Sequence, residues 1–338
     1  MRDVAHRAGV SIKTVSRVVN DEADIAETTR QRVIAAVEEL GYQPNAIARS
    51  LVSRRTNSLG VLTADFGDYT HARIIEGAEA EAREQGYLMF IGTAEHSSDG
   101  EPLRSPLLGQ HRFEGLFVVY HGTDHDTHEI FDYISPNLPI VTIGYAANRK
   151  NTTAISITNC EGAREATEHL LNLGRRRIAH ITGPANMYEC HERRRGYLEA
   201  LQAAGIVPDE AWIAAGDWSD ASGYQAAQAL LKRQLGFTAL FVQNDRMALG
   251  AMCALNEHGL HIPDDVAVVG FDDIPSAAYF IPPLTTIYQP TYELGRMGIR
   301  LLIDRINGRP VPANLIRLPT RLVIRSSCGA SILAAPLA

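Results

Sequence analysis

The chain has few cysteines and no long apolar run. Its four cysteines, at positions 160, 190, 253 and 328, are far apart, and the sequence contains no CxxC pair or cysteine–histidine cluster. This spacing indicates neither a zinc site nor a disulfide scaffold, so we expect no metal and no cofactor. No stretch approaches the roughly 18 consecutive apolar residues of a membrane span, and we expect no membrane association.

The sequence also lacks the marks of secretion and of catalysis. Asp3 follows the start at once, and no apolar segment of a signal peptide comes after it, so we expect a cytoplasmic protein. The patterns GxGxxG, GxxxxGK[ST] and GxSxG are absent. His180, His191 and His261 have acids or cysteines nearby but no triad spacing. We therefore expect no enzyme, and we interpret His180, at the end of an apolar strand, as a core residue.

The length of 338 residues fits about two domains of roughly 150 residues, with room for a small extra one. The net charge of -7 is unevenly spread. Residues 1–58 hold nine Lys/Arg and seven Asp/Glu (+2), whereas the remainder holds 23 and 32 (-9). A mildly cationic head on an anionic body fits a head that binds nucleic acid and a body that binds something else, although so small an excess also arises by chance.

The first twenty residues indicate two helices that cross. Gly9 permits a tight turn after the first helix, Ser11 is a good N-cap, and the second helix runs from about residue 12 to 20. Val15 and Val18 would lock the pair, as in a helix-turn-helix motif. The alternative is a helical hairpin with a solvated polar face. On that face lie groups suited to phosphates (Ser11, Thr14, Ser16, Asn20) and to base edges (Lys13, Arg17).

A third helix is expected over residues 27–40, and a polar connector over 53–58 is the expected domain boundary. The third helix would bury Val33, Ile34, Val37 and Leu40. Asn45 could cap a short helix that ends near Leu51.

The body predicts an α/β fold, because short apolar strands alternate with amphipathic helices, as in parallel sheets covered on both faces. We expect two lobes with doubly wound parallel sheets, which bind ligands at the carboxyl ends of their strands. The expected strands are 58–62, 87–91, 115–119, 139–143, 177–181, 239–242 and 266–271, and the expected helices are 73–85, 162–173, 194–204, 221–234 and 247–258.

Polar residues follow these strands, and together they suit a sugar, whose hydroxyls need polar partners and whose C–H face stacks on an aromatic ring. Each one also has a purely structural interpretation. Asp245, Asp217 or Ser219 could cap a helix, Arg193 could pair with a surface acid, and Trp218 could be packing.

The stretches DVA…AGVS…TVSRVVN (residues 3–20) and YQPNAIARSL (42–51) resemble the LacI/GalR family of bacterial transcription regulators. The resemblance implies a DNA-binding headpiece over 1–44 and a hinge helix and linker over 45–58. Ile12, Lys13 and Arg17 would contact bases, and Leu51 would wedge into the minor groove. The DNA-contact set implied is Ser11, Ile12, Lys13, Thr14, Ser16, Arg17, Asn20, Tyr42, Asn45, Ala48 and Leu51. One departure is Ala26, where the family has a serine N-cap.

The body is similar to the same family in the strings RRRGYLEAL (193–201), GDWS (216–219), QNDRMALG (243–250), GFDD (270–273) and PPLTTIYQ (282–289). This implies a two-lobed body like a periplasmic binding protein over 59–330, with one lobe at 59–156 plus 288–318 and the other at 157–285 plus 319–330. The resemblance assigns Arg193, Trp218, Asn244 and Asp272 to the effector site, while Asp65, Tyr69 and Glu189 are candidates because they follow strands. The full expected effector set is Asp65, Tyr69, Tyr145, Glu189, Arg193, Trp218, Asn244, Asp272 and Gln289. Tyr145 and Glu189 depart from the galactoside-responsive pattern of that family and predict a ligand other than the same galactoside.

We therefore expect a homodimeric repressor that binds a near-palindromic DNA operator under control of a small effector between the lobes. Trp218 and the acids favour a sugar. A purine corepressor is the alternative, because an aromatic ring with Arg and Asp also suits a base. A sugar-binding transport protein would share the body but lacks the headpiece.

Overall fold

The computed structural model describes residues 1–19, 24–42, 55–63, 66–93, 113–119, 134–144, 151–312 and 315–330. The chain divides into two compact units, Met1–Asn57 and Ser58–Ala338. None of the helices in the described part is long and apolar enough to cross a membrane.

The first unit contains the three expected helices, α1 (Arg2–Ala8), α2 (Ile12–Val19) and α3 (Glu27–Glu39). Gly9 ends α1 in the left-handed conformation, with φ 64°, which glycine adopts without steric cost. Ser11 caps α2 as predicted, because its Oγ accepts a hydrogen bond from the Thr14 amide at 3.1 Å. Val4, Val15, Val33 and neighbouring alanines form the small core.

The predicted buried stripe of α3 is partly wrong. Val33 and Ala36 are buried, whereas Ile34 is 44% exposed and Leu40 is 45% exposed. Ile34 lies about 100° around the helix from Val33, at 3.6 residues per turn, and therefore off the buried face. Leu40 follows the last helical residue, where the core has ended.

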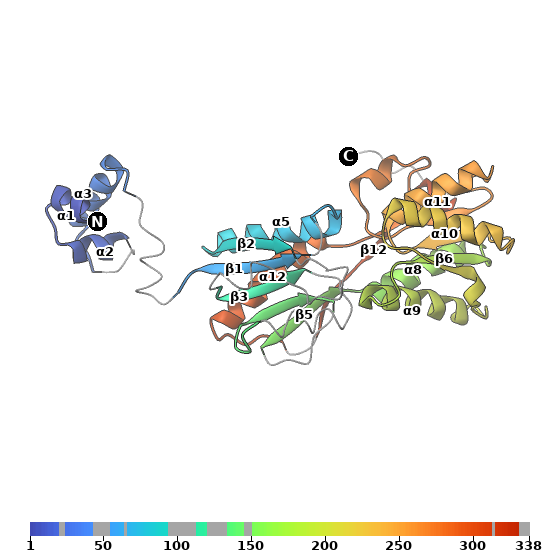
Figure 1. The fold of residues 1–338 in the computed structure, drawn as a ribbon, viewed down its shortest axis with the longest axis horizontal. Helices are drawn as coiled ribbons and strands as arrows, with labels where there is room; N and C mark the ends of the chain where they lie inside the picture. Colours follow the sequence, from blue (N-terminus) through green and yellow to red (C-terminus); the bar gives the residue numbers. More distant parts are fainter. Residues whose placement is uncertain are drawn as a thin grey trace, which may run out of the picture. The chain divides into compact units, whose positions relative to one another are not determined.

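The second unit begins with a sheet of six strands in the order β11-β5-β4-β3-β1-β2, and every neighbouring pair is parallel (Figure 1). The strands are β1 (Ser58–Thr63), β2 (Leu88–Thr93), β3 (Gly115–Val119), β4 (Ile140–Ile143), β5 (Thr152–Ile157) and β11 (Ile316–Leu318). Helices α5 (Tyr69–Glu84) and α12 (Thr291–Ile306) pack on one face of this sheet.

A second parallel sheet has the order β7-β6-β8-β9 and lies between two pairs of helices (Figure 1). Its strands are β6 (Ile178–Thr182), β7 (Ile213–Ala215), β8 (Ala239–Val242) and β9 (Ala267–Val269). The helices are α8 (Asn159–Asn172), α9 (Tyr188–Ala203), α10 (Asp220–Lys232) and α11 (Asp245–Glu257). Strands β10 (Thr286–Tyr288) and β12 (Arg321–Val323) form a separate, short antiparallel sheet of two strands.

The α/β prediction is confirmed, but several elements were misplaced or missed. Strands β5 and β7 and helix α12 were not predicted. Helix α9 begins at Tyr188, six residues before the predicted start, because the charged run at 192–195 hides its apolar periodicity. Strand β2 was expected to be buried, yet it is the edge strand, and Leu88 is 62% exposed.

In each sheet the strand order reverses beside the first strand, β1 in one and β6 in the other. Such reversals open a crevice at the carboxyl ends of the strands, where ligands bind in this architecture.

Candidate functional site

A cavity of about 340 Å³ lies among the residues that follow the strands of both sheets. Its lining therefore comes from segments far apart in the sequence, which the two parallel sheets bring together. The lining residues are Asp68, Thr70, His71, Ile74, Ile143, Ser156, Ile157, Asn159, Met187, Glu189, Arg193, Asp217, Trp218, Ser219, Asn244, Arg246, Asp272, Gln289 and Leu294.

Arg193 is the buried cation of this cavity. It is 5% exposed, and its guanidinium lies 3.8 Å from the centre of the Phe271 ring. Its Nε donates to Asn159 Oδ1 at 2.8 Å, and its Nη1 donates to the Gln243 carbonyl at 2.5 Å. The structural alternative, a surface ion pair, is therefore wrong. The stacked and hydrogen-bonded guanidinium is held in one orientation toward the cavity.

Asp272 is the buried acid beside it. Its carboxylate lies 3.8 Å from Arg193 Nη1 and accepts a hydrogen bond from the Gln289 side-chain amide. Burial raises the pKa of Asp272 well above its ordinary value, and Asp245 and Asp68 raise it further, whereas Arg193 opposes the shift. The backbone at Asp272 has φ 130°, a conformation that L residues rarely adopt. Such strain is characteristic of functional sites.

The prediction that Asp245 caps a helix is wrong. Asn244 is the N-cap of α11, since its Oδ1 accepts from the Met247 amide at 2.9 Å. Asp245 is fully buried instead and accepts from the Thr286 hydroxyl at 2.5 Å and the Ile274 amide at 3.0 Å. It thus ties α11 to the β10 strand behind the cavity.

Trp218 lies on the cavity wall with positive φ, 76°. Its indole Nε1 approaches Met187 Sδ at 3.1 Å. The capping interpretation holds for its neighbours, because Ser219 caps α10 through the Ser222 amide and Asp217 accepts from the Ser219 amide at 2.9 Å.

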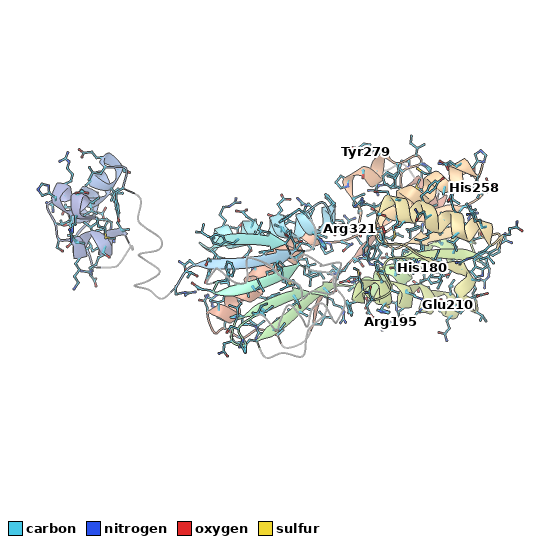
Figure 2. All side chains as sticks on the ribbon, in the orientation of Figure 1. His180, Arg195, Glu210, His258, Tyr279 and Arg321 are labelled. Carbon is cyan, nitrogen blue, oxygen red and sulfur yellow. The ribbon has the colours of Figure 1, made fainter. Side chains whose placement is uncertain are left out.

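His180, by contrast, is a core residue as predicted (Figure 2). Its Nδ1 lies 3.0 Å from the Phe241 carbonyl, and its Nε2 lies 3.0 Å from Gln243 Nε2. The ring stacks between Tyr197 and Phe241. Burial lowers the pKa of His180 to about 3, so the ring is neutral at physiological pH.

The first unit presents a separate polar surface along α2. Val15 and Val18 are buried on one side, while Ile12, Lys13 and Ser11 are exposed on the other. Thr14, Ser16 and Arg17 are half-buried. Tyr42 packs against the helical core, and its amide donates to the Val37 carbonyl.

Comparison with known proteins decides the family. Residues 1–45 match the bacterial regulatory proteins of the lacI family, and residues 167–328 match the periplasmic binding protein-like domain. The HTH-type transcriptional repressor PurR of Edwardsiella ictaluri is 38% identical over 97% of this chain and 96% of that protein. The chain belongs to the lacI family.

Solved structures agree with this placement in the lacI family. A Lac repressor dimer bound to operator and the anti-inducer ONPF has a TM-score of 0.85 at 33% identity, covering 97% of this chain and 98% of that one. The transcriptional regulator CelR in complex with cellobiose has a TM-score of 0.72 at 34% identity, with 96% and 98% covered.

Six residues of the effector set predicted for this lacI-family chain line the cavity together: Glu189, Arg193, Trp218, Asn244, Asp272 and Gln289. Tyr69 does not line it, because the helix that begins there turns Asp68, Thr70 and His71 to the cavity instead. Asp65 and Tyr145, and Asn20, Asn45, Ala48 and Leu51 of the DNA-contact set, lie outside the described residues.

Sequence reasoning missed Ser156 and Asn159. Ser156 lies in strand β5 and Asn159 follows it. The β-branched residues of TTAISI (152–157) are the sequence feature that could have predicted this strand. Asn159 holds the Arg193 guanidinium, so the missed strand also hid the partner that orients the central cation.

Proposed function

We propose that the protein is a DNA-binding transcriptional repressor whose operator binding is controlled by a small molecule in the cavity. The observation that carries the proposal is a ligand-sized cavity of about 340 Å³ in the same chain as a helix-turn-helix unit of the lacI family. It acts in the cytoplasm and has no enzymatic role. The PurR and Lac repressor relatives support repression.

On DNA, α2 enters the major groove. Ile12, Lys13 and Arg17 contact base edges, and Ser11, Thr14, Ser16 and Asn20 hold phosphates. Tyr42 of the headpiece and Asn45, Ala48 and Leu51 of the hinge segment add further contacts. The protein acts as a homodimer on a near-palindromic operator, in line with the Lac repressor dimer bound to operator.

The effector proposed for the cavity is a sugar. Arg193, Asp272 and Glu189 offer donors and acceptors to hydroxyls, and Trp218 offers an aromatic face. The cavity volume of about 340 Å³ falls within the roughly 300–1,000 Å³ of small-molecule sites, which is room for a monosaccharide. The CelR–cellobiose complex supports a sugar.

A purine is the second candidate. The observation in its favour is the likeness to PurR repressors along nearly the whole chain, including that of Proteus mirabilis at 37% identity. The flat Trp218 ring, which lines the cavity with Arg193 and Asp272, suits a planar base as well.

A thermal-shift screen of the full chain against monosaccharides, disaccharides and purine bases separates these candidates. A ligand at about 100 times its Kd should add about 2.7 kcal/mol of stability. We expect a sugar to raise Tm, and Trp218→Ala to weaken the shift while Trp212→Phe retains it. A purine hit would replace the sugar. No hit in the whole panel would contradict control by either class of ligand.

A further inference from the structure

Five helices of the second unit begin at the cavity: α5, α8, α9, α10 and α11. The N-terminus of a helix carries partial positive charge and free amide donors. Several such ends around one cavity would ordinarily make a strong phosphate site.

At α5, α10 and α11 the chain's own side chains use those donors, whereas α8 and α9 have no side-chain cap among the described residues. Asp68 Oδ1 accepts from the His71 amide at 3.0 Å at the start of α5. Asn244 Oδ1 accepts from the Met247 amide at 2.9 Å at the start of α11. At the start of α10, Ser219 Oγ accepts from the Ser222 amide at 3.1 Å. A phosphate would have to displace these caps to reach the amides.

The charges of the lining residues also disfavour a phosphate. Among the described lining residues, the carboxylates are Asp68, Glu189, Asp217 and Asp272, and the guanidinium groups are Arg193 and Arg246. Arg246 is bound at 2.8 Å to Asp220, and Arg193 has Asp272 at 3.8 Å, so neither positive charge is left uncompensated. Glu189 lies in the first turn of α9, is 6% exposed, and brings its own negative charge to that helix end.

Arg193 still offers a hydrogen bond to a ligand. Its Nε donates to Asn159 and its Nη1 to Gln243, while Nη2 makes no hydrogen bond within the described part of the chain. This donor suits a neutral oxygen such as a hydroxyl or a carbonyl.

We infer that the cavity selects an uncharged or positively charged ligand rich in hydrogen-bond donors and rejects phosphorylated ligands. Glu189 and Asp217 are the residues that exclude anions, because they bring negative charge to the helix ends that would otherwise bind a phosphate. This inference rests on the proposed function of the cavity as the effector site.

The sign of the electrostatic potential in the cavity can be measured without knowing the ligand. In the full chain with Trp212→Phe, Trp218 is the single tryptophan, and it lines the cavity. Its fluorescence is quenched with caesium and with iodide, each normalised to quenching of free N-acetyltryptophanamide. We expect the normalised caesium constant to exceed that of iodide by at least about twofold, because a negative potential concentrates cations. Equal constants, or stronger quenching by iodide, would overturn the inference.

Variants assign the effect to the named carboxylates. Glu189→Gln and Asp217→Asn should each lower the caesium preference. The matched control is Glu199→Gln on the same helix, ten residues and about 15 Å along the axis from Glu189. An equal loss of preference in the control would show that the effect comes from general surface charge and would contradict the assignment.

A ligand series then tests selection. Glucose, glucosamine and glucose 6-phosphate, with the matching galactose set, are compared by thermal shift on the unaltered chain. We expect the phosphate of each set to bind at least about tenfold more weakly than the free sugar. Tighter binding of a phosphate would overturn the inference. If every sugar fails while the caesium preference persists, the sugar effector fails and the anion exclusion stands.

Discussion

At the scale of single residues, Arg193 and Asp272 form a buried pair in the cavity wall, 3.8 Å apart. Arg193 lies on α9, and Asp272 follows β9. Both are almost completely buried, so each charge depends on the other and on neutral partners such as Asn159 and Gln289. Removing one member of a buried pair leaves the other charge uncompensated, which costs more than the pair itself contributes.

Arg193→Met should therefore lower the free energy of unfolding by about 3–5 kcal/mol. The double variant Arg193→Met/Asp272→Asn should recover part of that loss, because no buried charge remains alone. Urea denaturation of the full chain measures both. Additive losses in the double variant would show that the two side chains are not coupled.

His180 makes stability depend on pH. Its pKa is about 3 in the folded chain and about 6.5 in an unfolded one, so its contribution is complete above pH 6.5 and is lost as the pH falls toward 3. Asp245 acts in the opposite direction, because burial raises its pKa to about 7 and its contribution is lost as the pH rises from about 4 to 7.

Because His180 and Asp245 have opposite effects on the pH dependence of stability, the two effects partly cancel in the unaltered chain. The His180 contribution is therefore measured as the difference between the unaltered chain and a His180 variant. Between pH 6.5 and 4, His180→Gln should reduce the pH slope of the unfolding free energy by up to about 1.4 kcal/mol per pH unit. Chemical denaturation of both proteins at several pH values checks this. Parallel curves for the two proteins would mean that His180 does not titrate on unfolding in this range.

At the scale of elements, local capping explains where helices begin. Asp68, Ser219 and Asn244 start α5, α10 and α11 with side-chain hydrogen bonds, as these residue types do in general. Helix α3 begins at Glu27, and the Ala26 before it has no side chain able to cap it.

Ala26→Ser should stabilise α3 by about 1 kcal/mol, because a hydroxyl there can accept from an amide of the first turn. Hydrogen exchange of the α3 amides, read by mass spectrometry, measures the gain. Ala35→Ser, at an exposed interior position of the same helix, is the control and should lower protection slightly. A gain at position 35 but none at 26 would refute the capping argument.

For α2, the exposed polar face predicts sequence-specific contacts. Arg17→Ala should weaken binding to the preferred operator by about 1–3 kcal/mol and reduce discrimination between operator sequences. Binding-site selection followed by titration at fixed salt measures both effects. An unchanged base preference would remove Arg17 from the base-reading set and leave it a phosphate contact.

At the scale of the whole molecule, the proposed control of DNA binding is a coupling between two sites. Coupling free energy is reciprocal, so an effector that weakens operator binding by a given factor must itself bind more weakly to the operator complex by that factor. Calorimetric titration of the effector, with and without operator DNA, should give the same factor as operator titrations. Effector affinity that ignores the operator would exclude allosteric control by that ligand.

Much of the candidate site could be predicted from the sequence, because its polar residues follow apolar strands or begin helices. Arg193, Trp218 and Asp272 were found in this way and through family resemblance. Tyr69 does not line the cavity, because α5 begins there, four residues before the helix start that the sequence predicts. Asn159 was missed because strand β5 was not recognised. Errors of this kind arise at element boundaries, where a shift of a few residues changes which side chain faces the cavity.

The sequence by itself determined the alternation of strands and helices, the helix-turn-helix unit and the core position of His180. These properties depend on periodicity and on neighbours within a few residues, which any chain of this sequence carries locally. Only the tertiary structure decided that β2 is an edge strand, that Asp245 ties α11 to β10, and that Arg193 meets Asn159 and Asp272 across one cavity. Strand order and burial set these contacts, and both result from packing between segments that are distant along the chain.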